Sequence, residues 1–417
     1  MRPFGALPLA LLLLPILASG APADPVPRAA ERDPHAPIAI TSDALLLLPD
    51  VLVGNGVRRG SGTASDPYVI EGWDIDASSQ DGILLSGVTR HVVIRNNRIA
   101  NGLESAGRYV YSGIVVQNSG NVTIEGNDIE NCYDGIFLRE RVRARVEGNR
   151  VDTVRNAGIE SWASEATLLG NDIRRSDRAG VAWAAEPTSP LSASVRGNVL
   201  ADVEVGIHVR GGRDHVVEGN RVSRAVAQAL LVETAQGTSL LGSNLADGSA
   251  TGVEVSAARA DVRDNVLARN ALGLLADGGV RASGNAIHDN ARGVVVLAGE
   301  PELTGNDLFD NRAAGLVATP GTLAAGNWWG SRDGPSGMGP GRGDRVEGGV
   351  FAPFAASPWT VAGRNRGEGA SLGYGGPPPG DEAEGDAWLG AVLLAGGLAV
   401  VVAGVWRARR RRGGDGS

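Results

Sequence analysis

Apolar and polar residues alternate in short segments, and this alternation recurs along most of the chain. In each repeat, the third residue before a Gly-Asn or similar turn is apolar, and the second residue after it is usually apolar. Positions between them are often charged, which is typical of β-strands with one buried face. The turn asparagines recur every 20 to 30 residues, at Asn97, Asn127, Asn149, Asn171, Asn198, Asn220, Asn244, Asn265, Asn285, Asn306 and Asn327.

The length of the repeat predicts a solenoid of β-coils. Units of about 23 residues are too short for a helix pair, and they suit one coil of three short strands. Stacked coils form parallel sheets in which each coil buries the apolar face of the next. At about 4.8 Å per coil, 11 to 12 coils make a rod roughly 50–60 Å long. The asparagines then form a ladder of side-chain amides, so we expect them to be structural rather than catalytic.

Two segments add a family resemblance to this pattern. The first begins at Gly60 and reads Gly-Ser-Gly-Thr-Ala-Ser-Asp-Pro-Tyr-Val-Ile-Glu-Gly-Trp-Asp-Ile. The second begins at Gly326 and reads Gly-Asn-Trp-Trp-Gly-Ser-Arg-Asp-Gly-Pro-Ser-Gly. From about Ile38 to about Pro358 the chain resembles right-handed parallel β-helix proteins of the carbohydrate-binding and sugar-hydrolase type, and within them the NosD-like group. The resemblance implies an all-β fold, a single right-handed parallel β-helix over residues 38–358. It says little about activity.

The two ends of the chain predict export and membrane anchoring. Arg2 and the apolar run Ala6–Leu17 form a signal peptide, followed by small residues suited to cleavage. Ala387–Trp406 has twenty residues without a charge, enough for a helix about 30 Å long that crosses one bilayer core. The arginines that follow predict a cytoplasmic C-terminus. The expected domains are a signal peptide (1–23), a linker (24–37), the β-helix (38–358), a Gly/Pro-rich acidic stalk (359–386), a transmembrane helix (387–406) and a cytoplasmic tail (407–417).

This topology places a single-pass protein in the cell membrane, with its body extracellular or periplasmic. Asn121-Val122-Thr123 is a glycosylation sequon, which matters only in a host that modifies asparagine. The net charge of −8 and the pI of about 5.3 argue against nucleic acid as a partner. One cysteine excludes a disulfide framework, the five histidines show no metal-binding spacing, and methionine occurs only at positions 1 and 338. We therefore predict no metal and no other cofactor.

Candidate chemistry lies on the strand that follows a recurring small residue, usually glycine. Positions two and four beyond that residue are expected to point outward, in two columns. The first is Phe137, Glu160, Ala182, His208, Leu231, Glu254, Leu275 and Val295; the second is Arg139, Trp162, Ala184, Arg210, Glu233, Ser256, Asp277 and Leu297. Glu160, Trp162, His208 and Arg210 are the predicted ligand-binding residues, because an exposed tryptophan beside charged groups suits sugar rings.

Glu233 and Glu254 form the nearest pair of carboxylates across neighbouring coils, about 8 Å apart, and are the catalytic candidates. The dense aspartate clusters of polygalacturonase-like and pectate-lyase-like members of the resembled group are missing here. Three functions stay open at this point. The favoured one is binding of a cell-surface or extracellular polysaccharide or glycan without catalysis. The alternatives are a NosD-like accessory or scaffold that serves a protein partner, and a polysaccharide lyase or hydrolase.

Overall fold

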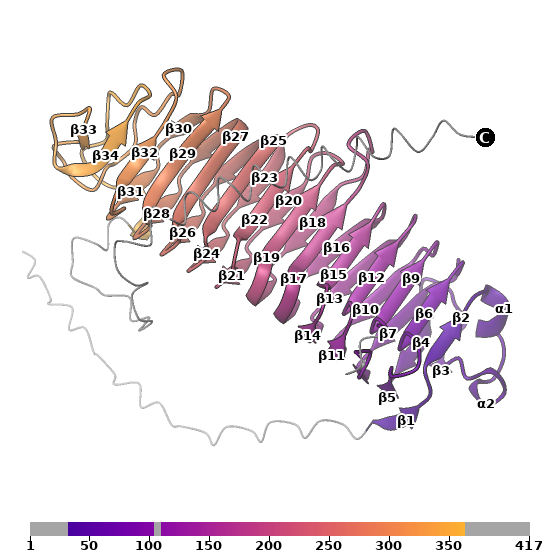
Figure 1. The fold of residues 1–417 in the computed structure, drawn as a ribbon. Helices are drawn as coiled ribbons and strands as arrows, with labels where there is room; N and C mark the ends of the chain where they lie inside the picture. Colours follow the sequence, from indigo (N-terminus) through magenta and orange to yellow (C-terminus); the bar gives the residue numbers. More distant parts are fainter. Residues whose placement is uncertain (1–31, 104–109, 363–417) are drawn as a thin grey trace, which may run out of the picture.

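The computed structural model describes residues 32–103 and 110–362 and shows an elongated β-solenoid (Figure 1). The expected signal peptide, transmembrane helix and tail, and nearly all of the stalk, lie outside the described residues. Within the described ranges, no helix is long and apolar enough to cross a bilayer. Each coil passes through three parallel sheets in turn, which we call faces I, II and III, and each strand pairs with its counterparts in the coils before and after.

The strands are short because each coil turns a corner after four or five residues. Face I contains β4 (Tyr68–Glu71), β7 (Val92–Arg95), β10 (Val122–Glu125), β13 (Arg143–Glu147), β16 (Glu165–Leu169), β18 (Ala193–Arg196), β20 (Val216–Glu218), β23 (Ser239–Gly242) and β30 (Glu302–Thr304). Face II contains β1 (Asp33–His35), β5 (Trp73–Asp76), β8 (Arg98–Ala100), β11 (Asp128–Cys132), β14 (Arg150–Val154), β21 (Arg221–Ser223), β24 (Leu245–Asp247), β26 (Val266–Ala268), β28 (Ala286–His288) and β31 (Asp307–Phe309).

Face III carries the predicted functional columns. It contains β2 (Ile38–Ile40), β6 (Ile83–Ser86), β9 (Ile114–Gln117), β12 (Ile136–Arg139), β15 (Ala157–Trp162), β22 (Gln228–Glu233), β29 (Arg292–Ala298) and β32 (Ala314–Val317). Four longer strands turn a corner without a break. β17 (Asp172–Ala184) and β19 (Val199–Arg210) run from face II into face III, whereas β25 (Thr251–Arg263) and β27 (Leu272–Ser283) run from face III into face I.

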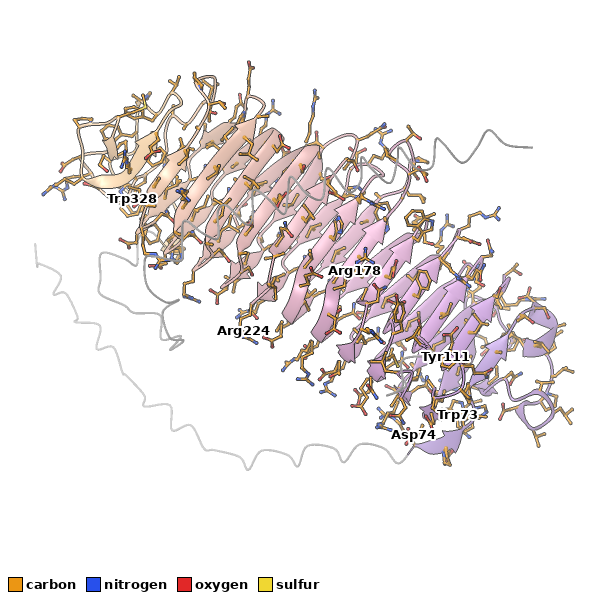
Figure 2. All side chains as sticks on the ribbon, in the orientation of Figure 1. Trp73, Asp74, Tyr111, Arg178, Arg224 and Trp328 are labelled. Carbon is orange, nitrogen blue, oxygen red and sulfur yellow. The ribbon has the colours of Figure 1, made fainter. Side chains whose placement is uncertain are left out.

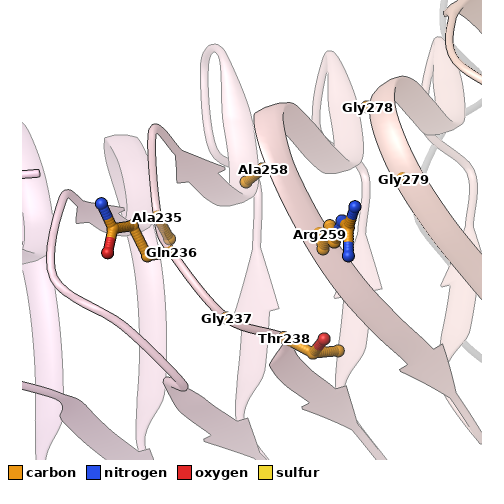
Figure 3. Close-up of a pocket in the computed structure, with 8 residues that line it drawn as sticks. All are labelled: Ala235, Gln236, Gly237, Thr238, Ala258, Arg259, Gly278 and Gly279. Atoms are coloured by element: carbon orange, nitrogen blue, oxygen red, sulfur yellow. The ribbon is translucent and has the colours of Figure 1, made fainter.

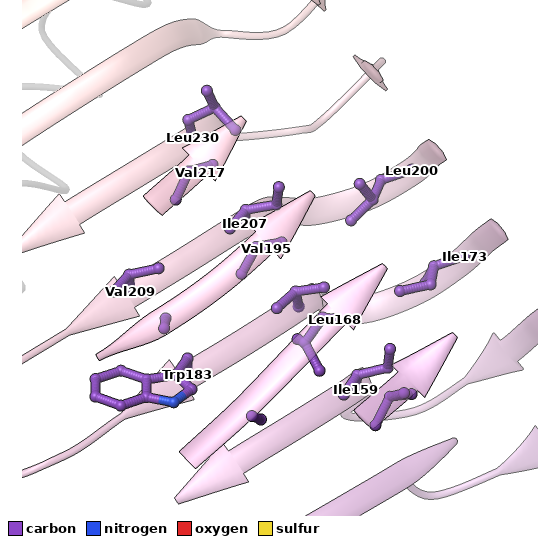
Figure 4. Close-up of a cluster of buried hydrophobic side chains, with 14 of the residues drawn as sticks. Ile159, Leu168, Ile173, Trp183, Val195, Leu200, Ile207, Val209, Val217 and Leu230 are labelled. Atoms are coloured by element: carbon purple, nitrogen blue, oxygen red, sulfur yellow. The ribbon is translucent and has the colours of Figure 1, made fainter. Parts of the chain in front are cut away.

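The core is a set of apolar stacks along the axis of the rod. On face I, the third residue before each turn asparagine pairs with the same position in the next coil, so that Leu168, Val195 and Val217 lie above one another (Figure 4). Ile173 and Leu200 form the matching stack on face II, and all five side chains are buried. Because each coil covers the apolar surface of its neighbour, burial accumulates coil by coil.

The turn asparagines form a continuous hydrogen-bonded ladder between faces I and II. From Asn97 to Asn306, each side-chain Nδ2 donates to Oδ1 of the next asparagine at 2.8–3.0 Å. The backbone N–H of each donates to the same oxygen at 2.9–3.1 Å. The ladder therefore satisfies buried polar groups at every corner that it occupies.

A second, shorter ladder lies between faces II and III, and the sequence analysis did not predict it. Asn270 Nδ2 donates to Asn290 Oδ1 at 3.2 Å, and Asn290 Nδ2 donates to Asn311 Oδ1 at 2.9 Å. Asn311 Nδ2 ends the ladder on the Asp344 carboxylate at 2.7 Å. Each of the three asparagines stands three or four residues before the small residue that opens face III, and this spacing is the signal that could have revealed the ladder.

Both ends of the rod are covered. At the N-terminal end lie α1 (Asp43–Leu46), α2 (Asp50–Val53) and β3 (Val57–Arg59), which pairs antiparallel with β4. At the C-terminal end, β34 (Gly343–Glu347) pairs with β32 and with β33 (Pro335–Gly337). Trp73 and Trp328 lie at opposite ends in Figure 2 and are buried beneath these segments, as are Tyr68 and Trp329. The caps remove the open sheet edges that would otherwise invite pairing between molecules.

Candidate functional site

The strand register places the predicted residues in two aligned columns on face III. Glu160 pairs with Ala182, Ala182 with His208, His208 with Leu231, and Leu231 with Glu254. The second column lies two residues further along each strand, and each of its members pairs with the next: Trp162, Ala184, Arg210, Glu233, Ser256 and Asp277. The last member of the second column was wrong: a register shift after Ala276 places Ala298, not Leu297, opposite Asp277.

The two outward positions on β17 are both alanines, with larger residues on the two neighbouring strands. Ala182 and Ala184 lie between Glu160 and Trp162 on β15 and His208 and Arg210 on β19; we call these six residues the alanine trough. The flanking strands are two rungs apart, about 9.6 Å. Trp162 is 39% exposed, which is high for so large an apolar side chain. The trough is thus a small-residue floor with an aromatic residue and charged groups on both sides.

His208 joins the trough to the first catalytic candidate. Its Nε2 lies 3.0 Å from Glu233 Oε1, and both side chains are half-buried. The hydrogen bond with His208 lowers the pKa of Glu233; burial opposes this shift, and the charges of His208 and Arg210 add to it. Glu233 is therefore held as a carboxylate.

Glu254, the second catalytic candidate, has the opposite shift. Burial raises its pKa, and the negative charges of Glu233 and Asp277 raise it further, although Gln228 Nε2 donates a hydrogen bond to Glu254 at 2.8 Å. Glu233 and Glu254 are diagonal neighbours, because Glu254 pairs with Leu231 and Glu233 pairs with Ser256. One rung and two strand residues separate them, which corresponds to about 8 Å between their backbones.

A third group of polar residues lies where the chain enters face III in the N-terminal half, and sequence reasoning included only one of its members. Asn156 Nδ2 donates to Asp134 Oδ1 at 2.7 Å and to Glu160 Oε2 at 2.6 Å. Burial raises the pKa of Asp134 to about 6, and the charge of Glu160 adds to the shift. Arg178, labelled in Figure 2, donates to Asn156 Oδ1 at 3.2 Å. Glu160 is thus both a wall of the trough and a member of this group.

Asp81 extends this third group toward the N-terminus. It accepts a hydrogen bond from the backbone N–H of Ser112 at 2.9 Å, and burial raises its pKa. Asp81, Ser112 and Asp134 each stand directly before a glycine that opens face III, which is the sequence signal that could have identified them. Glycine is needed there because a Cβ would collide with the next coil: at Gly158 it would contact Ile173 and lie 2.7 Å from the Gly180 carbonyl oxygen.

Many charges on faces I and II are paired with a neighbour on the same strand or on the adjacent coil. On face II, Arg150 contacts Asp128 at 3.1 Å and Asp152 at 3.0 Å. On face I, Arg95 contacts Glu71 at 2.7 Å and Glu125 at 3.4 Å. Such exposed pairs contribute little energy each, but they leave no cluster of uncompensated carboxylates.

The described part of the chain contains no group of three or more His, Cys, Asp or Glu side chains placed to hold a metal ion. Cys132 is buried at the corner between faces II and III, and burial raises the pKa of its thiol to about 12. This thiol is therefore a poor nucleophile and a poor metal ligand at neutral pH.

The sequence profile of the right handed beta helix region matches residues 53–189, 112–281 and 186–327 in overlapping segments. The chain belongs to this family. No characterised protein with a curated description matches the β-helix protein in sequence. The NosD-like subgroup stays a prediction, since the family profile covers parallel β-helix repeats in general.

Solved structures that are similar to this β-helix protein have low sequence identity to it and low TM-scores. The periplasmic alginate epimerase AlgG is 12% identical with a TM-score of 0.40, and the match covers 77% of this chain and 85% of the epimerase. An α-1,3-glucanase of Streptomyces thermodiastaticus is 16% identical with a TM-score of 0.37, covering 70% and 62%. The surface adhesin PfbA of Streptococcus pneumoniae is 9% identical with a TM-score of 0.33, covering 71% and 82%. The chain thus spans less than two thirds of the glucanase unit.

Proposed function

We propose that this β-helix protein binds a polysaccharide or glycan chain along face III, with the alanine trough as the central contact. The sequence-based expectation of export and of an anchor at residues 387–406 is part of the proposal, and it would present face III outside the cell. Binding without cleavage is the primary function proposed.

The observation that carries the proposal is the position of Ala182 and Ala184 between two strands whose outward side chains can bind sugars. The backbones of β15 and β19 lie about 9.6 Å apart, and between them β17 presents only the methyl groups of Ala182 and Ala184, against which a flat ring can lie. Trp162 offers an aromatic surface for stacking at one wall. Glu160 accepts and Arg210 donates hydrogen bonds, which is what neutral sugar hydroxyls require.

The electrostatics of face III support the same site. Among the described carboxyl groups, those with a raised pKa are Asp81, Asp134 and Glu254, and all three lie on face III or directly before one of its strands. On face II, by contrast, the hydrogen bond from Arg224 lowers the pKa of Asp202. Carboxylates with raised pKa values oppose folding at neutral pH, and such groups cluster at functional sites.

The test is a glycan-binding screen on the full-length protein, with product analysis of every ligand that binds. We expect Trp162→Ala to weaken binding about tenfold, since aromatic stacking and lost contact area contribute about 1–2 kcal/mol. Ala184→Leu should abolish binding by filling the trough. Ala201→Leu is the matched control, because Ala201 points outward on face II. Equal binding by Ala184→Leu and wild type would refute the site, and co-purification of a protein with no glycan binding would favour the scaffold alternative.

Hydrolysis is the second candidate, and the opposite pKa shifts of Glu233 and Glu254 favour it. Two neighbouring carboxyl groups whose pKa values are shifted in opposite directions are the pattern of a general base and a general acid. Their backbones are about 8 Å apart, which is compatible with the spacing of about 6.5–9.5 Å between the carboxyl groups of inverting glycosidases. In the same screen, new chain ends that disappear in both Glu233→Gln and Glu254→Gln would establish this activity, whereas intact products would exclude it for the ligands tested.

A further inference from the structure

A cavity of about 480 Å³ opens at the corner between face III and face I, just after the end of β22 and over the middle of β25 and β27, where these two long strands turn the corner. Figure 3 shows Gln236, Thr238 and Arg259 around it, with no side chain at the glycine positions. Its lining consists of Ala235, Gln236, Gly237, Thr238, Ala258, Arg259, Gly278 and Gly279. It lies two residues beyond Glu233 and directly after Asp277, so it continues the outward surface of face III around the corner.

Arg259 is the charged residue of this cavity, and its guanidinium group is uncompensated. Arg259 is exposed, and among residues 32–103 and 110–362 no carboxylate forms an ion pair with it. This differs from the rung-paired arginines of faces I and II, such as Arg281, which contacts Glu302 at 3.1 Å. An exposed guanidinium presents a planar fork of donors that matches the oxygens of a carboxylate or a sulfate.

Glycines keep the surface beside Arg259 bare. Arg259 pairs with Gly279 on the next coil, where a Cβ would lie 3.1 Å from Arg259 Cγ. Gly237, on the preceding coil, has a φ of +68°, and a Cβ there would collide with the Asp214 carboxylate. At Gly278, next to Gly279, a Cβ would collide with the backbone carbonyl of Ala258. The absence of side chains at Gly278 and Gly279 leaves space beside the guanidinium on the coil of β27.

Two of the carboxylates near the cavity are already engaged. Asp214 accepts from Arg213 Nε at 2.8 Å and from the Thr238 backbone N–H at 3.0 Å. Glu233 is bound to His208 at 3.0 Å. Arg213 offsets the charge of Asp214. Asp277, directly before Gly278, and Asp261, two residues beyond Arg259 on β25, are further carboxylates near the cavity, so the preference for an anion depends on the contact with Arg259 itself.

We propose that this cavity holds an anionic substituent, a carboxylate or a sulfate, of the sugar chain bound on face III. Arg259 pairs with the charged oxygens, and Gln236 and Thr238 hydrogen-bond to the adjoining ring. The inference rests on the proposed function and names its ligand class: a glycan in which at least some residues carry a negative charge.

The experiment compares three oligosaccharides of equal length by calorimetry on the full-length protein: one neutral, one containing uronate residues and one sulfated. We expect wild type to bind one anionic ligand about tenfold more tightly than the neutral one, with the preference falling as salt rises. Arg259→Gln should remove the preference and retain binding of the neutral ligand. Arg259→Lys keeps the positive charge but lacks the planar pair of N–H donors of the guanidinium group, so it should retain part of the preference. Arg281→Gln is the control, since Arg281 is already paired.

The outcomes separate the two proposals. Absence of binding to all three ligands would refute the proposed function and, with it, this inference. Binding of all three with equal affinity would refute the inference alone. A preference that persists in Arg259→Gln, or that is lost equally in Arg281→Gln, would also overturn the assignment to this cavity. Which anionic ligand is preferred decides between the carboxylate and the sulfate.

Discussion

Removal of one asparagine from the middle of the long ladder should be among the most costly single substitutions in the rod. Asn220 is 1% exposed; its Nδ2 donates to the Val195 carbonyl at 2.9 Å, and its Oδ1 accepts from the Asn198 backbone N–H at 2.9 Å. In Asn220→Ala both backbone groups lose these partners while they stay buried. Each such group costs about 1–3 kcal/mol, so we expect a loss of about 2–6 kcal/mol in the free energy of unfolding.

Alanine at position 220 introduces no backbone strain that would obscure this result, because Gly219, with a φ of +66°, is the left-handed residue of the turn. Equilibrium unfolding in urea measures the loss, and Arg221→Ala, an exposed neighbour, is the control. Hydrogen exchange provides the local readout, since the Asn198 amide should lose protection. A loss below about 1 kcal/mol relative to Arg221→Ala would refute the reasoning.

Two further predictions concern buried titratable groups. Asp134 keeps its proton up to about pH 6 in the folded state, whereas its ordinary pKa is 3.8, so its contribution to stability falls as pH rises through that window. Asp134→Asn retains the acceptor for Asn156 and should raise the free energy of unfolding by about 2–3 kcal/mol at pH 7.5 and by little at pH 4; an equal effect at both pH values would contradict this account. Cys132, whose burial raises the pKa of the thiol to about 12, should react with a thiol reagent only after unfolding, and rapid labelling of the native protein would show that the corner opens.

The sequence predicted what depends on the repeat itself. A parallel sheet places equivalent positions of successive coils beside one another, so a periodic asparagine must meet its counterparts, and columns such as Glu160, Ala182 and His208 can be written from the chain. The single error in a column, at Leu297, arose where β29 shifts its register by one residue. The repeat contains no signal for such a local shift.

Features that depend on contacts between different columns could not be predicted in the same way. The hydrogen bonds from Asn156 to Asp134 and Glu160 join residues from different positions of the repeat, and only the turn between faces II and III brings them together. The alanine trough was missed for another reason: Ala182 and Ala184 carry no chemistry, and they matter only because larger residues flank them on both neighbouring strands. The cavity at Arg259 similarly depends on glycines whose role is backbone packing.

The spacing of the two proposed subsites sets the kind of ligand that can use both. The stacked strands of a solenoid fix the distances between side chains along face III, and a rigid rod of this kind cannot close around a small molecule. Trp162 lies on β15, and Arg259 belongs to the coil of β25, four rungs further along face III. At about 4.8 Å per rung, this separation is about 19 Å, which exceeds the length of a disaccharide. Only a chain of several sugar rings can occupy the alanine trough and reach Arg259 at the same time, so we expect the highest affinity for oligosaccharides or polymers longer than this span.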